Sequence, residues 1–297
     1  MGIKYLNRYL INKCTKQSIC SIPIQQLRGK TLAFDAFIYI YKYLGEDRLQ
    51  ERFQQLITAC RKQTITPIFV FDGKPPDEKK CMIDQRRKNK DAAELQYNQL
   101  LHTPDASKEH LLELKKQFVR VTPHHVQLVK AVLQQNHVQY IEAPSEADIV
   151  CVQLVRSWKA WACVSDDMDM FVYGCTRVLR SWSLDDESVE LYILPSILRE
   201  LHMSMSDFRD ILVISGTDYN NDDHIPLFKT LRLFRTYKNM RPPQQQGEKV
   251  KVIKAFPFYD WLRNNTPYIH DYDKLTRIHA QFNAIYGFES QNRGLTS

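Results

Sequence analysis

The alternation of apolar and charged segments predicts an α/β fold with a mainly parallel central sheet flanked by helices. Two short apolar runs, Thr31–Asp35 and Pro67–Asp72, are separated by helix-forming sequence, which is the pattern of a β-α-β crossover. Such a crossover is right-handed and makes its two strands parallel. Both runs end in an aspartate, so the predicted sheet carries acidic residues where its strands end.

The composition is that of an ordinary globular chain and excludes several other classes. Of the 297 residues 43% are hydrophobic and 25% charged, and no apolar run approaches the roughly 18–20 residues that a membrane span requires. The apolar segment at the start is too short for a signal peptide, and the sixth position lacks the Ser or Thr of a myristoylation signal. Seven scattered cysteines without a CxxC pair indicate a reducing compartment and no zinc site.

The first part of the chain alternates between helices and strands. We expect helices over Lys4–Lys13, Ala36–Leu44 and Asp47–Gln63, the last with one clearly apolar side. The strand Pro67–Asp72 is ended by Gly73 and the two prolines that follow, which break regular structure. This order, helix, strand, two helices and strand, is the opening expected of an α/β sheet.

The segment 77–117 has a different character and predicts a helical insertion. It is charged, favours helix and is poor in β-branched residues. Lys79, Arg86 and Lys90 are spaced by seven and then four residues, so they can share one face of a helix. A charged helix face is often merely solvated, but this one leaves directly from the strand that ends at Asp72.

The second half continues the α/β pattern as far as about residue 218. The expected elements are a helix begun by Thr122 and Pro123 and running to Asn136, a strand Val138–Ile141, a helix Glu146–Arg156, strands Trp161–Val164 and Val178–Ser181, and a helix Asp207–Ile214 capped by Ser206. The remainder, 220–297, is rich in aromatic residues, and periodicity does not assign it. Residues 242–247 (PPQQQG) form a predicted loop.

Acidic residues stand at the ends of several of these predicted core elements. They are Asp35, Asp72, Glu146, Asp148, Asp167, Asp169 and Asp218. The carboxyl ends of parallel strands face one crevice, so we expect these side chains to converge. Carboxylates gathered in this way repel one another and lose solvation unless a cation joins them. The alternative is structural, because short acidic pairs also form turns and cap helices.

The residue types at this predicted site favour a hard divalent cation. Oxygen ligands suit Mg²⁺ or Mn²⁺, whereas zinc prefers His or Cys. Two such cations about 4 Å apart can hold a phosphodiester, activate a water and stabilise the leaving oxygen. The net charge of +7 is concentrated in basic clusters within 74–90 and 229–241. An acidic centre flanked by basic clusters suits a polyanion brought to divalent metals.

Six stretches of the chain resemble the flap endonuclease branch of the XPG-type structure-specific 5′ nucleases. They are MGIKYL at the N-terminus, LAFDAFIYIY around Asp35, PIFVFDGKPP around Asp72, EAPSEAD around Glu146, SDDMD with FVYG around Asp167, and ISGTDY around Asp218. Their order and approximate spacing fit as well. The resemblance implies a PIN-like/XPG nuclease core made of residues 1–76 (the N region) and 122–219 (the internal region), a helical arch or gateway over 77–121, and a divergent, mainly helical duplex-DNA-binding region over 220–297.

The resemblance also implies roles for the acidic residues. Asp35, Asp72, Glu146 and Asp148 would hold a first metal, and Asp148 would share the second with Asp167, Asp169 and Asp218. The family usually has a glutamate at the position of Asp148, so this side chain is one methylene shorter. We therefore expect water-mediated coordination there. Asp166, next to these residues, would have no direct contact with a metal.

Further roles follow for basic and aromatic residues. Lys79 and Arg86 fall at the spacing of the two basic residues that the family presents to the scissile phosphate, and we expect them to be catalytic. Tyr41 would stack on the terminal unpaired nucleotide, although core packing is an open alternative because neighbouring aromatic residues compete for both roles. The other expected DNA-binding residues are Gly2 through its backbone, Lys80, Arg87 and Lys90 on the arch, and Lys229, Arg232 and Arg235 beyond it.

One segment departs from the family pattern. After ISGTDY the family has a glycine-rich helix-two-turn-helix that grips duplex phosphates with the help of a bound K⁺. Here the sequence NNDDHIPLFKTLRLFRTYKN contains no glycine, and Asp222 and Asp223 carry negative charge where a phosphate would lie. We therefore expect a different grip on duplex DNA, based on the basic residues after position 228, and a K⁺ site is doubtful.

The resemblance implies a Mg²⁺-dependent 5′ flap endonuclease, with Mn²⁺ as a substitute, and a 5′→3′ exonuclease activity on branched DNA in replication, repair and recombination. Two alternatives stay open: a non-catalytic relative that binds DNA junctions, and a PIN-like ribonuclease. We expect a monomer without a membrane partner, and the family's sliding-clamp tail motif is not found. The stretch Arg86–Lys90 (RRKNK) resembles a nuclear signal but coincides with the arch, so a nuclear or a cytoplasmic, viral replication site stays open.

Overall fold

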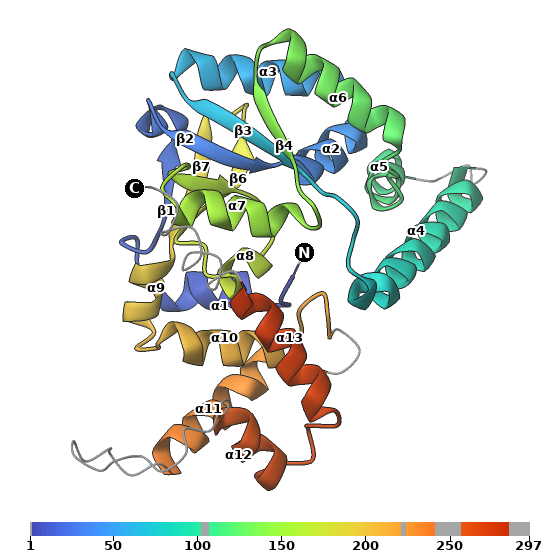
Figure 1. Ribbon diagram of the computed structural model, residues 1–297. Coiled ribbons are helices and arrows are strands. Elements are labelled where there is room, and N and C mark those ends of the chain that lie inside the picture. The colour runs from blue at the N-terminus through green and yellow to red at the C-terminus, as the bar shows by residue number, and fades with distance from the viewer. Residues whose placement is uncertain (1, 102–106, 221–223, 241–256, 285–297) are drawn as a thin grey trace. The chain divides into compact units, whose positions relative to one another are not determined.

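The computed structural model describes residues 2–101, 107–220, 224–240 and 257–284 (Figure 1). The chain forms two compact units that alternate along the sequence. Unit 1 takes residues 1–19, 167–175 and 193–297, and unit 2 takes residues 20–166 and 176–192. Each unit has its own set of buried side chains, so each is considered by itself.

Unit 2 is built around a central sheet. Its strands are β1 (Ile19–Pro23), β2 (Thr31–Asp35), β3 (Thr66–Phe71), β4 (Gln139–Glu142), β5 (Ala162–Val164), β6 (Arg177–Ser183) and β7 (Ser188–Ile193). In the described residues the strand order is β1-β7-β6-β5-β2-β3-β4. The four neighbouring pairs from β4 to β6 are all parallel. The predicted mainly parallel α/β sheet is therefore confirmed.

The strand β2 lies in the middle of the sheet because nearly all its side chains are apolar. Phe34 is fully buried and stacks on Phe69 of β3, with 5.0 Å between the ring centroids. A strand covered on both faces reads as a continuous apolar run, which is how β2 and β3 appear in the sequence. The parallel register places Asp35 beside Val70, so the acidic ends of β2 and β3 lie at the same edge of the sheet.

Helices cover both faces of this sheet (Figure 1). Those of unit 2 are α2 (Ala36–Gly45), α3 (Leu49–Lys62), α4 (Lys80–Leu101), α5 (Lys108–Gln117), α6 (Pro123–Gln135) and α7 (Ala147–Arg156), with 3₁₀ turns η1 (Ile24–Leu27) and η2 (Asp77–Lys79). The helix α7 packs against β2, β3 and β5, whereas α3 packs against α6. The helices α4 and α5 pack against each other, so the segment expected to be an insertion is helical where the structure describes it. No described helix has the length and apolarity needed to cross a membrane.

Unit 1 is helical in its described part. Its helices are α1 (Leu6–Lys13), α8 (Asp169–Val172), α9 (Leu194–Glu200), α10 (Met205–Ile214), α11 (Leu227–Met240), α12 (Pro257–Asn265) and α13 (Tyr272–Ala284). The helix α10 packs against α8, α11 and α13. A buried contact between His279 Nε2 and Asp210 Oδ1, at 2.8 Å, joins α13 to α10. Periodicity leaves the C-terminal region unassigned, but the family resemblance implies a mainly helical region, and the described part of 220–297 is helical.

Several local predictions are wrong in detail. Ser206 does not cap α10; Ser204 does, accepting a hydrogen bond from the Asp207 backbone N–H at 3.0 Å. Asp207 follows Ser204 by three residues, which is the spacing of a capping box. Lys79 is not on the same helix as Arg86, because α4 begins one residue later. The strands β1 and β7 and the helices α8 and α9 were not predicted, and the predicted loop 242–247 lies outside the described residues.

Candidate active site

Four of the predicted metal ligands lie in unit 2, and we call them the strand-end group: Asp35, Asp72, Glu146 and Asp148. Asp35 ends β2 and caps α2, accepting a hydrogen bond from the Phe37 N–H at 3.2 Å. Its second oxygen accepts a hydrogen bond from Ser165 Oγ at 3.3 Å. The two hydrogen bonds give each oxygen of this buried carboxyl group a partner.

Asp72 lies directly after β3 and connects this strand to α7. Its Oδ1 accepts a hydrogen bond from the backbone N–H of Ala147 at 2.7 Å. Gly73 makes this approach possible, because a Cβ there would lie 2.1 Å from the carbonyl oxygen of Ala143. The Gly73 N–H also donates to Ser145 O at 2.6 Å. A glycine is therefore needed after Asp72 to hold this carboxylate at the start of α7.

Glu146 and Asp148 lie at the N-terminus of α7, where the helix dipole favours negative charge. Glu146 is the N-cap residue and is buried, whereas Asp148 is half-buried in the first turn. The ammonium of Lys79 forms an ion pair with Glu146. Lys79 is itself largely buried, so the residue predicted to contact the phosphate is held against a predicted metal ligand.

The other three predicted ligands lie in unit 1, and we call them the loop group: Asp167, Asp169 and Asp218. All three are buried. Asp167 Oδ1 accepts a hydrogen bond from the Asp169 N–H at 3.0 Å, and Asp169 Oδ2 accepts one from the Asp218 N–H at 3.5 Å. The backbone hydrogen bonds thus tie the three aspartates to one another. Buried carboxylates this close repel one another, so the group is suited to a cation.

Gly2 lies directly over the loop group. A Cβ at this position would lie 2.6 Å from Asp167 Oδ1 and 2.7 Å from Asp169 Oδ1, and the φ of Gly2 is +77°. Both the close approach and the left-handed backbone require glycine. Gly2, predicted to approach DNA, therefore has a second role in covering two of the carboxylates.

Asp166 makes its hydrogen bonds within unit 2 and is not part of the loop group, as expected. Its Oδ1 accepts a hydrogen bond from the Ser181 N–H at 2.7 Å, and its carbonyl oxygen accepts one from Arg180 at 3.0 Å. Both partners lie on β6. Although Asp166 is adjacent to Asp167 in the sequence, its hydrogen bonds therefore fix it to β6 of the sheet.

The donor set of both groups consists of carboxylate oxygens, which fits a hard divalent cation such as Mg²⁺ or Mn²⁺. In the part of the chain that the structure describes, no three His, Cys, Asp or Glu side chains are already arranged to hold a metal ion. Metal ligation by these residues is therefore a proposal that rests on their chemistry.

Tyr41 on α2 and Arg86 and Lys90 on α4 are three of the predicted site residues in unit 2. Tyr41 is 39% exposed, whereas Tyr39 is 2% exposed and packs against Phe34. The ammonium of Lys90 lies 4.5 Å from the centroid of the Tyr41 ring. Burial raises the pKa of Tyr41, Arg86 lowers it in part, and Asp72 raises it further. Tyr39 thus takes the core position, and Tyr41 is available to a nucleotide.

The remaining predicted DNA-binding residues differ in their surroundings. Lys80 and Arg87 are exposed on α4, and Lys80 forms an ion pair with Asp77 at 2.9 Å. In unit 1, Arg232 and Arg235 are exposed on α11, but the Lys229 ammonium lies 3.7 Å from the centroid of the Tyr268 ring. Lys229 therefore contributes to packing between α11 and the segment before α13.

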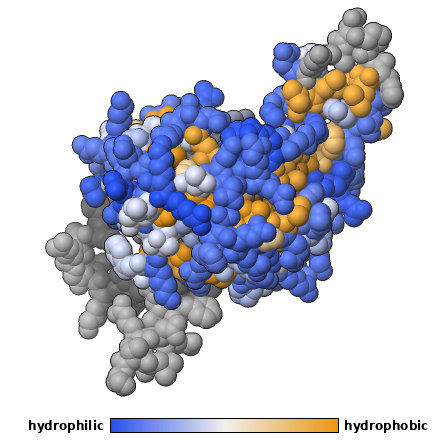
Figure 2. Space-filling model, turned by 90° about the horizontal axis from the view of Figure 1, so that it is seen from above, coloured by the Kyte–Doolittle hydropathy of each residue, from blue (hydrophilic) through white to orange (hydrophobic). Residues whose placement is uncertain are grey.

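The gateway helices also expose apolar side chains. Figure 2 shows hydrophobic residues at the surface beside the undescribed residues 102–106. The exposed large residues of α4 and α5 include Leu95, Leu101 and Leu112. These two helices bury little apolar surface, with Ala93 and Leu114 as their buried hydrophobic residues. Helices held by so few apolar contacts separate at a lower free-energy cost than the helices of a core.

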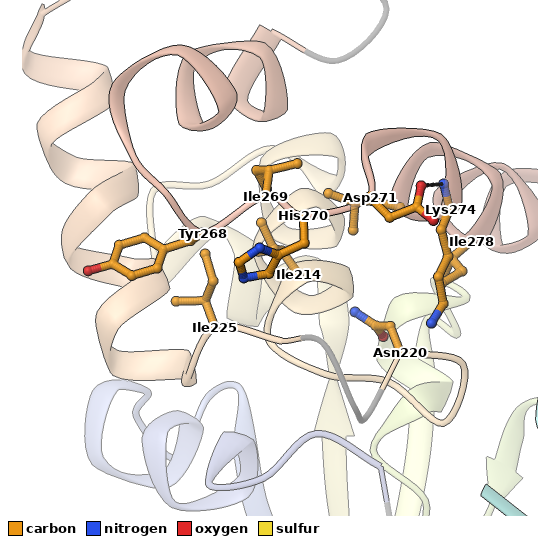
Figure 3. A pocket seen from close by; sticks show the side chains of 10 residues that line it. Ile214, Asn220, Ile225, Tyr268, Ile269, His270, Asp271, Lys274 and Ile278 are labelled. Carbon is orange, nitrogen blue, oxygen red and sulfur yellow. Dashed lines mark hydrogen bonds between the residues drawn. The ribbon is translucent and has the colours of Figure 1, made fainter. Parts of the chain in front are cut away.

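A pocket in unit 1 adjoins the turn that holds Asp218. Figure 3 shows its lining, which comes from α10, from Asn220 and Ile225, from the segment that leads into α13, and from α13 itself. Asn220 Oδ1 accepts hydrogen bonds from the backbone N–H and the hydroxyl of Thr217, at 2.8 and 2.7 Å. The amide group of Asn220 thus closes the turn and fixes the position of Asp218.

Two positioning residues were missed by the sequence analysis. Ser165 lies beside Asp35 because β2 and β5 pair in register, with Phe34 opposite Val164. Arg209 is buried on α10, and its Nε donates to the carbonyl oxygen of Val172, the last residue of α8, at 2.9 Å. Asp169 is the first residue of that short helix. The register could have revealed Ser165, but nothing in the sequence distinguishes Arg209 from a surface arginine.

Two family models match the chain. The XPG N-terminal domain matches residues 1–93, and the XPG I-region matches residues 137–218. Flap endonuclease 1 of Glycine max is 30% identical over 287 residues, covering 89% of this chain and 74% of the relative. Flap endonuclease 1 of Methanocaldococcus jannaschii is 32% identical over 215 residues, covering 67% of this chain and 65% of the relative.

Solved structures with the same fold agree with these matches. The flap endonuclease-1 from Methanococcus jannaschii superposes with a TM-score of 0.56 at 24% identity, covering 97% of this chain and 100% of that one. The catalytic core of Rad2 in complex with DNA substrate gives a TM-score of 0.62 at 19% identity, covering 96% and 81%. At these identities the two structures support the fold alone.

Proposed function

The chain belongs to the flap endonuclease branch of the XPG family of nucleases, and on this premise we propose that it is a Mg²⁺-dependent 5′ flap endonuclease. It would also remove nucleotides from a 5′ end in the 5′→3′ direction, acting on branched DNA in replication and repair. The observation that carries the proposal is the ion pair between Lys79 and Glu146. This pair holds the first basic residue of the gateway against a carboxylate of the strand-end group.

The strand-end group and the loop group are the proposed metal ligands. Asp35, Asp72, Glu146 and Asp148 would hold one divalent cation, and Asp148 would share a second with Asp167, Asp169 and Asp218. When bound, the cations would lower the pKa of water and stabilise charge on the oxygens of a phosphodiester. The protein contributes carboxylates whose positions are fixed by backbone hydrogen bonds.

Lys79 and Arg86 are the proposed phosphate contacts. The Lys79 ammonium is largely buried and paired with Glu146, so it is oriented before a substrate arrives. Cations that are already in place stabilise the charge that develops on a phosphoryl group without further reorganisation. Arg86 is half-buried one turn before Lys90 on α4, and it would contact the same phosphate from the gateway side.

Tyr41 and Lys90 would guide the single-stranded 5′ end. An exposed aromatic ring stacks on a nucleobase irrespective of its identity, and a lysine beside the ring offers a contact to the phosphate. The ring of Tyr41 is accessible, and the ammonium of Lys90 lies against it. The two residues would therefore select an unpaired nucleotide at the entrance to the gateway.

A cleavage assay tests this function. The protein is incubated with 5′-flap, nicked, gapped and Holliday-junction DNA, and with RNA of the same flap sequence, in Mg²⁺, in Mn²⁺ or in EDTA. We expect cleavage of the DNA flap near its base in Mg²⁺ or Mn²⁺ and none in EDTA. Asp169→Ala should abolish cleavage, whereas Asp166→Asn, the matched control, should cleave like the wild type because the asparagine side chain keeps an acceptor for the Ser181 N–H.

Three outcomes contradict the proposed function or its assigned residues. Flap binding without cleavage in either metal would indicate a non-catalytic junction-binding protein. Preferential cleavage of the RNA flap would indicate a PIN-like ribonuclease. Undiminished cleavage by a pure preparation of the Asp169→Ala variant would refute the assigned metal ligands.

A further inference from the structure

Two exposed aromatic rings lie in contact on the surface of unit 1. Tyr5, just before α1, is 52% exposed, and Phe228 at the start of α11 is 50% exposed. Their ring centroids are 6.3 Å apart. Beneath them, the buried ring of Tyr9 meets Phe228 edge-on, also at 6.3 Å. Tyr9 thus packs into the protein, while Tyr5 and Phe228 present an apolar surface to the outside.

The backbone of Tyr5 is strained for an aromatic residue. Its φ is +66° and its ψ is 0°, in the left-handed region that favours glycine. Tyr5 is the N-cap residue of α1, but its side chain makes no capping hydrogen bond. Neither capping nor core packing accounts for a tyrosine at this position. A strained residue with an exposed side chain indicates a role outside the fold.

The two rings are surrounded by positive charge. The Lys4 ammonium lies 5.5 Å from the centroid of the Tyr5 ring, and Arg8 is exposed on α1. On α11, Arg232 and Arg235 follow Phe228 at four and seven residues, so they share its face. Neither 4–13 nor 227–240 contains an aspartate or glutamate. The charge is therefore uniformly positive along both helices.

Arg235 links the two helices electrostatically. Burial raises the pKa of the Tyr9 hydroxyl on α1, and the guanidinium of Arg235 on α11 partly offsets this rise. Other cations of α11 have neighbours of a different kind, because Lys238 pairs with Asp207 at 3.1 Å and Lys229 lies on Tyr268. The positive charge next to the exposed rings thus comes chiefly from arginines, which combine charge with a planar stacking surface.

We propose that Lys4, Tyr5, Arg8, Phe228, Arg232 and Arg235 form an aromatic–basic patch that binds DNA where a base face is exposed. The two rings stack on that face, and the four cations contact the neighbouring phosphates. Inside a duplex each base is covered on both sides, so the patch fits a strand end or an unpaired nucleotide. The inference rests on the proposed function, because branched DNA supplies such nucleotides beside the cleavage site.

The patch also offers a grip on DNA that needs no glycine. A glycine-rich loop binds phosphates through backbone N–H groups. In the patch, side-chain cations contact the phosphates and the rings stack on a base, so the backbone need not approach the DNA closely. The segment 224–240 contains no glycine, and its exposed face carries Phe228, Arg232 and Arg235. The carboxylates of an acidic protein partner would contact the cations but would not stack on the rings. DNA would contact both, so it is the partner that explains both parts of the patch.

Binding measurements with Ca²⁺ in place of Mg²⁺ test the proposal. Fluorescence anisotropy reports the affinity for a labelled single strand and a labelled 5′-flap DNA, and a relaxed, covalently closed circular duplex serves as a competitor without strand ends. The variant is Tyr5→Gly with Phe228→Ala, in which glycine relieves the backbone strain at position 5. The controls are Ile11→Ala, an exposed apolar residue on α1, and Trp158→Ala, a ring 80% exposed beside Arg177 in unit 2.

The proposal predicts a loss in affinity of about tenfold or more for the single strand and the flap in the ring variant. The closed circle should compete as well as before, and both controls should bind like the wild type. Arg232→Ala with Arg235→Ala should weaken binding to every DNA. It should also lower the slope of log K against log salt by about 2. Thermal melting of each variant checks that it is folded.

Any of three DNA-binding results overturns the proposal. The ring variant could bind the single strand and the flap with wild-type affinity, it could lose as much affinity for the closed circle, or the Trp158→Ala control could lose as much affinity as the ring variant. Retained DNA binding with lost binding to polyglutamate would assign the patch to an acidic protein and overturn it as well. The proposed function can fail separately. A wild type that cleaves no flap but binds DNA through the rings would refute the nuclease activity and support the patch.

Discussion

The strand-end group and the loop group carry the same chemical groups but are held in different ways. In unit 2, Asp35 caps α2, Asp72 accepts from the first turn of α7, and Glu146 is paired with Lys79. Each of these carboxylates therefore also stabilises the fold. In unit 1, Asp167 and Asp169 accept hydrogen bonds from backbone N–H groups of the loop group itself. Their negative charges lie close together and are buried.

This difference separates the contribution of a site carboxylate to stability from its contribution to activity. Substitution of a strand-end residue should affect both stability and activity, because the side chain caps a helix or balances a cation. Neutralising a loop-group residue should affect activity alone, because it removes repulsion between buried like charges. Such trade-offs between stability and activity are common at sites built for a charged ligand.

The largest expected effect is that of Asp169→Asn. Flap cleavage should fall by more than about a hundredfold, because even residues that only support a metal ligand are worth about 10–100-fold. The melting temperature measured without divalent cations should stay the same or rise. A gel-based cleavage assay and thermal denaturation check the two parts. A clear decrease in melting temperature would show that Asp169 stabilises the fold, and the distinction between the groups would be lost.

The next largest loss of cleavage is expected for Lys79→Ala and Arg86→Ala. Both should lower cleavage by about a hundredfold at a fixed flap concentration, because each removes a cation from the phosphate. Only Lys79→Ala should also destabilise the protein, by about 1–3 kcal/mol, because it leaves the buried Glu146 without its ion pair. Urea denaturation of both variants measures this difference. Equal stabilities would contradict the assigned ion pair.

Gly2→Ala should have a smaller effect, confined to activity. The added Cβ would meet Asp167 and Asp169 at 2.6 and 2.7 Å, so the N-terminus must move away from the loop group. We expect cleavage to fall by about tenfold, in line with the loss of a supporting contact at a metal ligand. The melting temperature should change little because Gly2 is not part of a helix or strand. Single-turnover cleavage measures the effect, and wild-type rates would contradict it.

The smallest effect concerns pH and the gateway. Burial lowers the pKa of Lys90, and Arg120 and Arg86 lower it further. The folded protein therefore binds fewer protons at Lys90 than the unfolded chain, so its stability rises with pH as the ordinary lysine pKa is approached. The raised pKa of Tyr41 acts in the opposite direction, but only near pH 10 and above. The free energy of unfolding should change by about 1 kcal/mol or less.

Comparison with Lys90→Met isolates this contribution. Between pH 7 and pH 9.5 the stability of the wild type should increase relative to that of the variant. Guanidinium denaturation at several pH values provides the measurement. A constant difference across this range would show that the environment of Lys90 does not disfavour its charge.

Most of the sheet and the positions of its acidic ends could be predicted from the sequence. The strands β2 and β3 are buried on both faces, so their apolar runs are continuous and end at a charged residue. The helix begun by Pro123 was predicted because Thr122 suits an N-cap and Pro123 suits the first helical position. In the structure Thr122 caps this helix and also forms a capping box with His125. Local signals of this kind depend on neighbouring residues and need no knowledge of the fold.

The remaining features depend on contacts between distant residues. The strand β1 lies at one edge of the sheet and β7 lies next to it. Neither has a continuous apolar run in the sequence, and α8 is a single turn defined by its packing on α10. The partners of Ser165 and Arg209 come from other elements of the chain. Tyr39 and Tyr41 have the same sequence character, and only the packing of α2 on the sheet distinguishes the buried ring from the exposed one.

The most direct test of the proposed metal ligation by the strand-end and loop groups is a calorimetric titration of the protein with Mn²⁺. It is performed on the protein bound to a non-cleavable 5′-flap DNA and compares the wild type with Asp35→Asn and Asp169→Asn, one from each group. We expect two Mn²⁺ ions per wild-type protein and one in each variant. Two ions of unchanged affinity in either variant, or none in the wild type, would contradict the assignment of both groups as metal ligands.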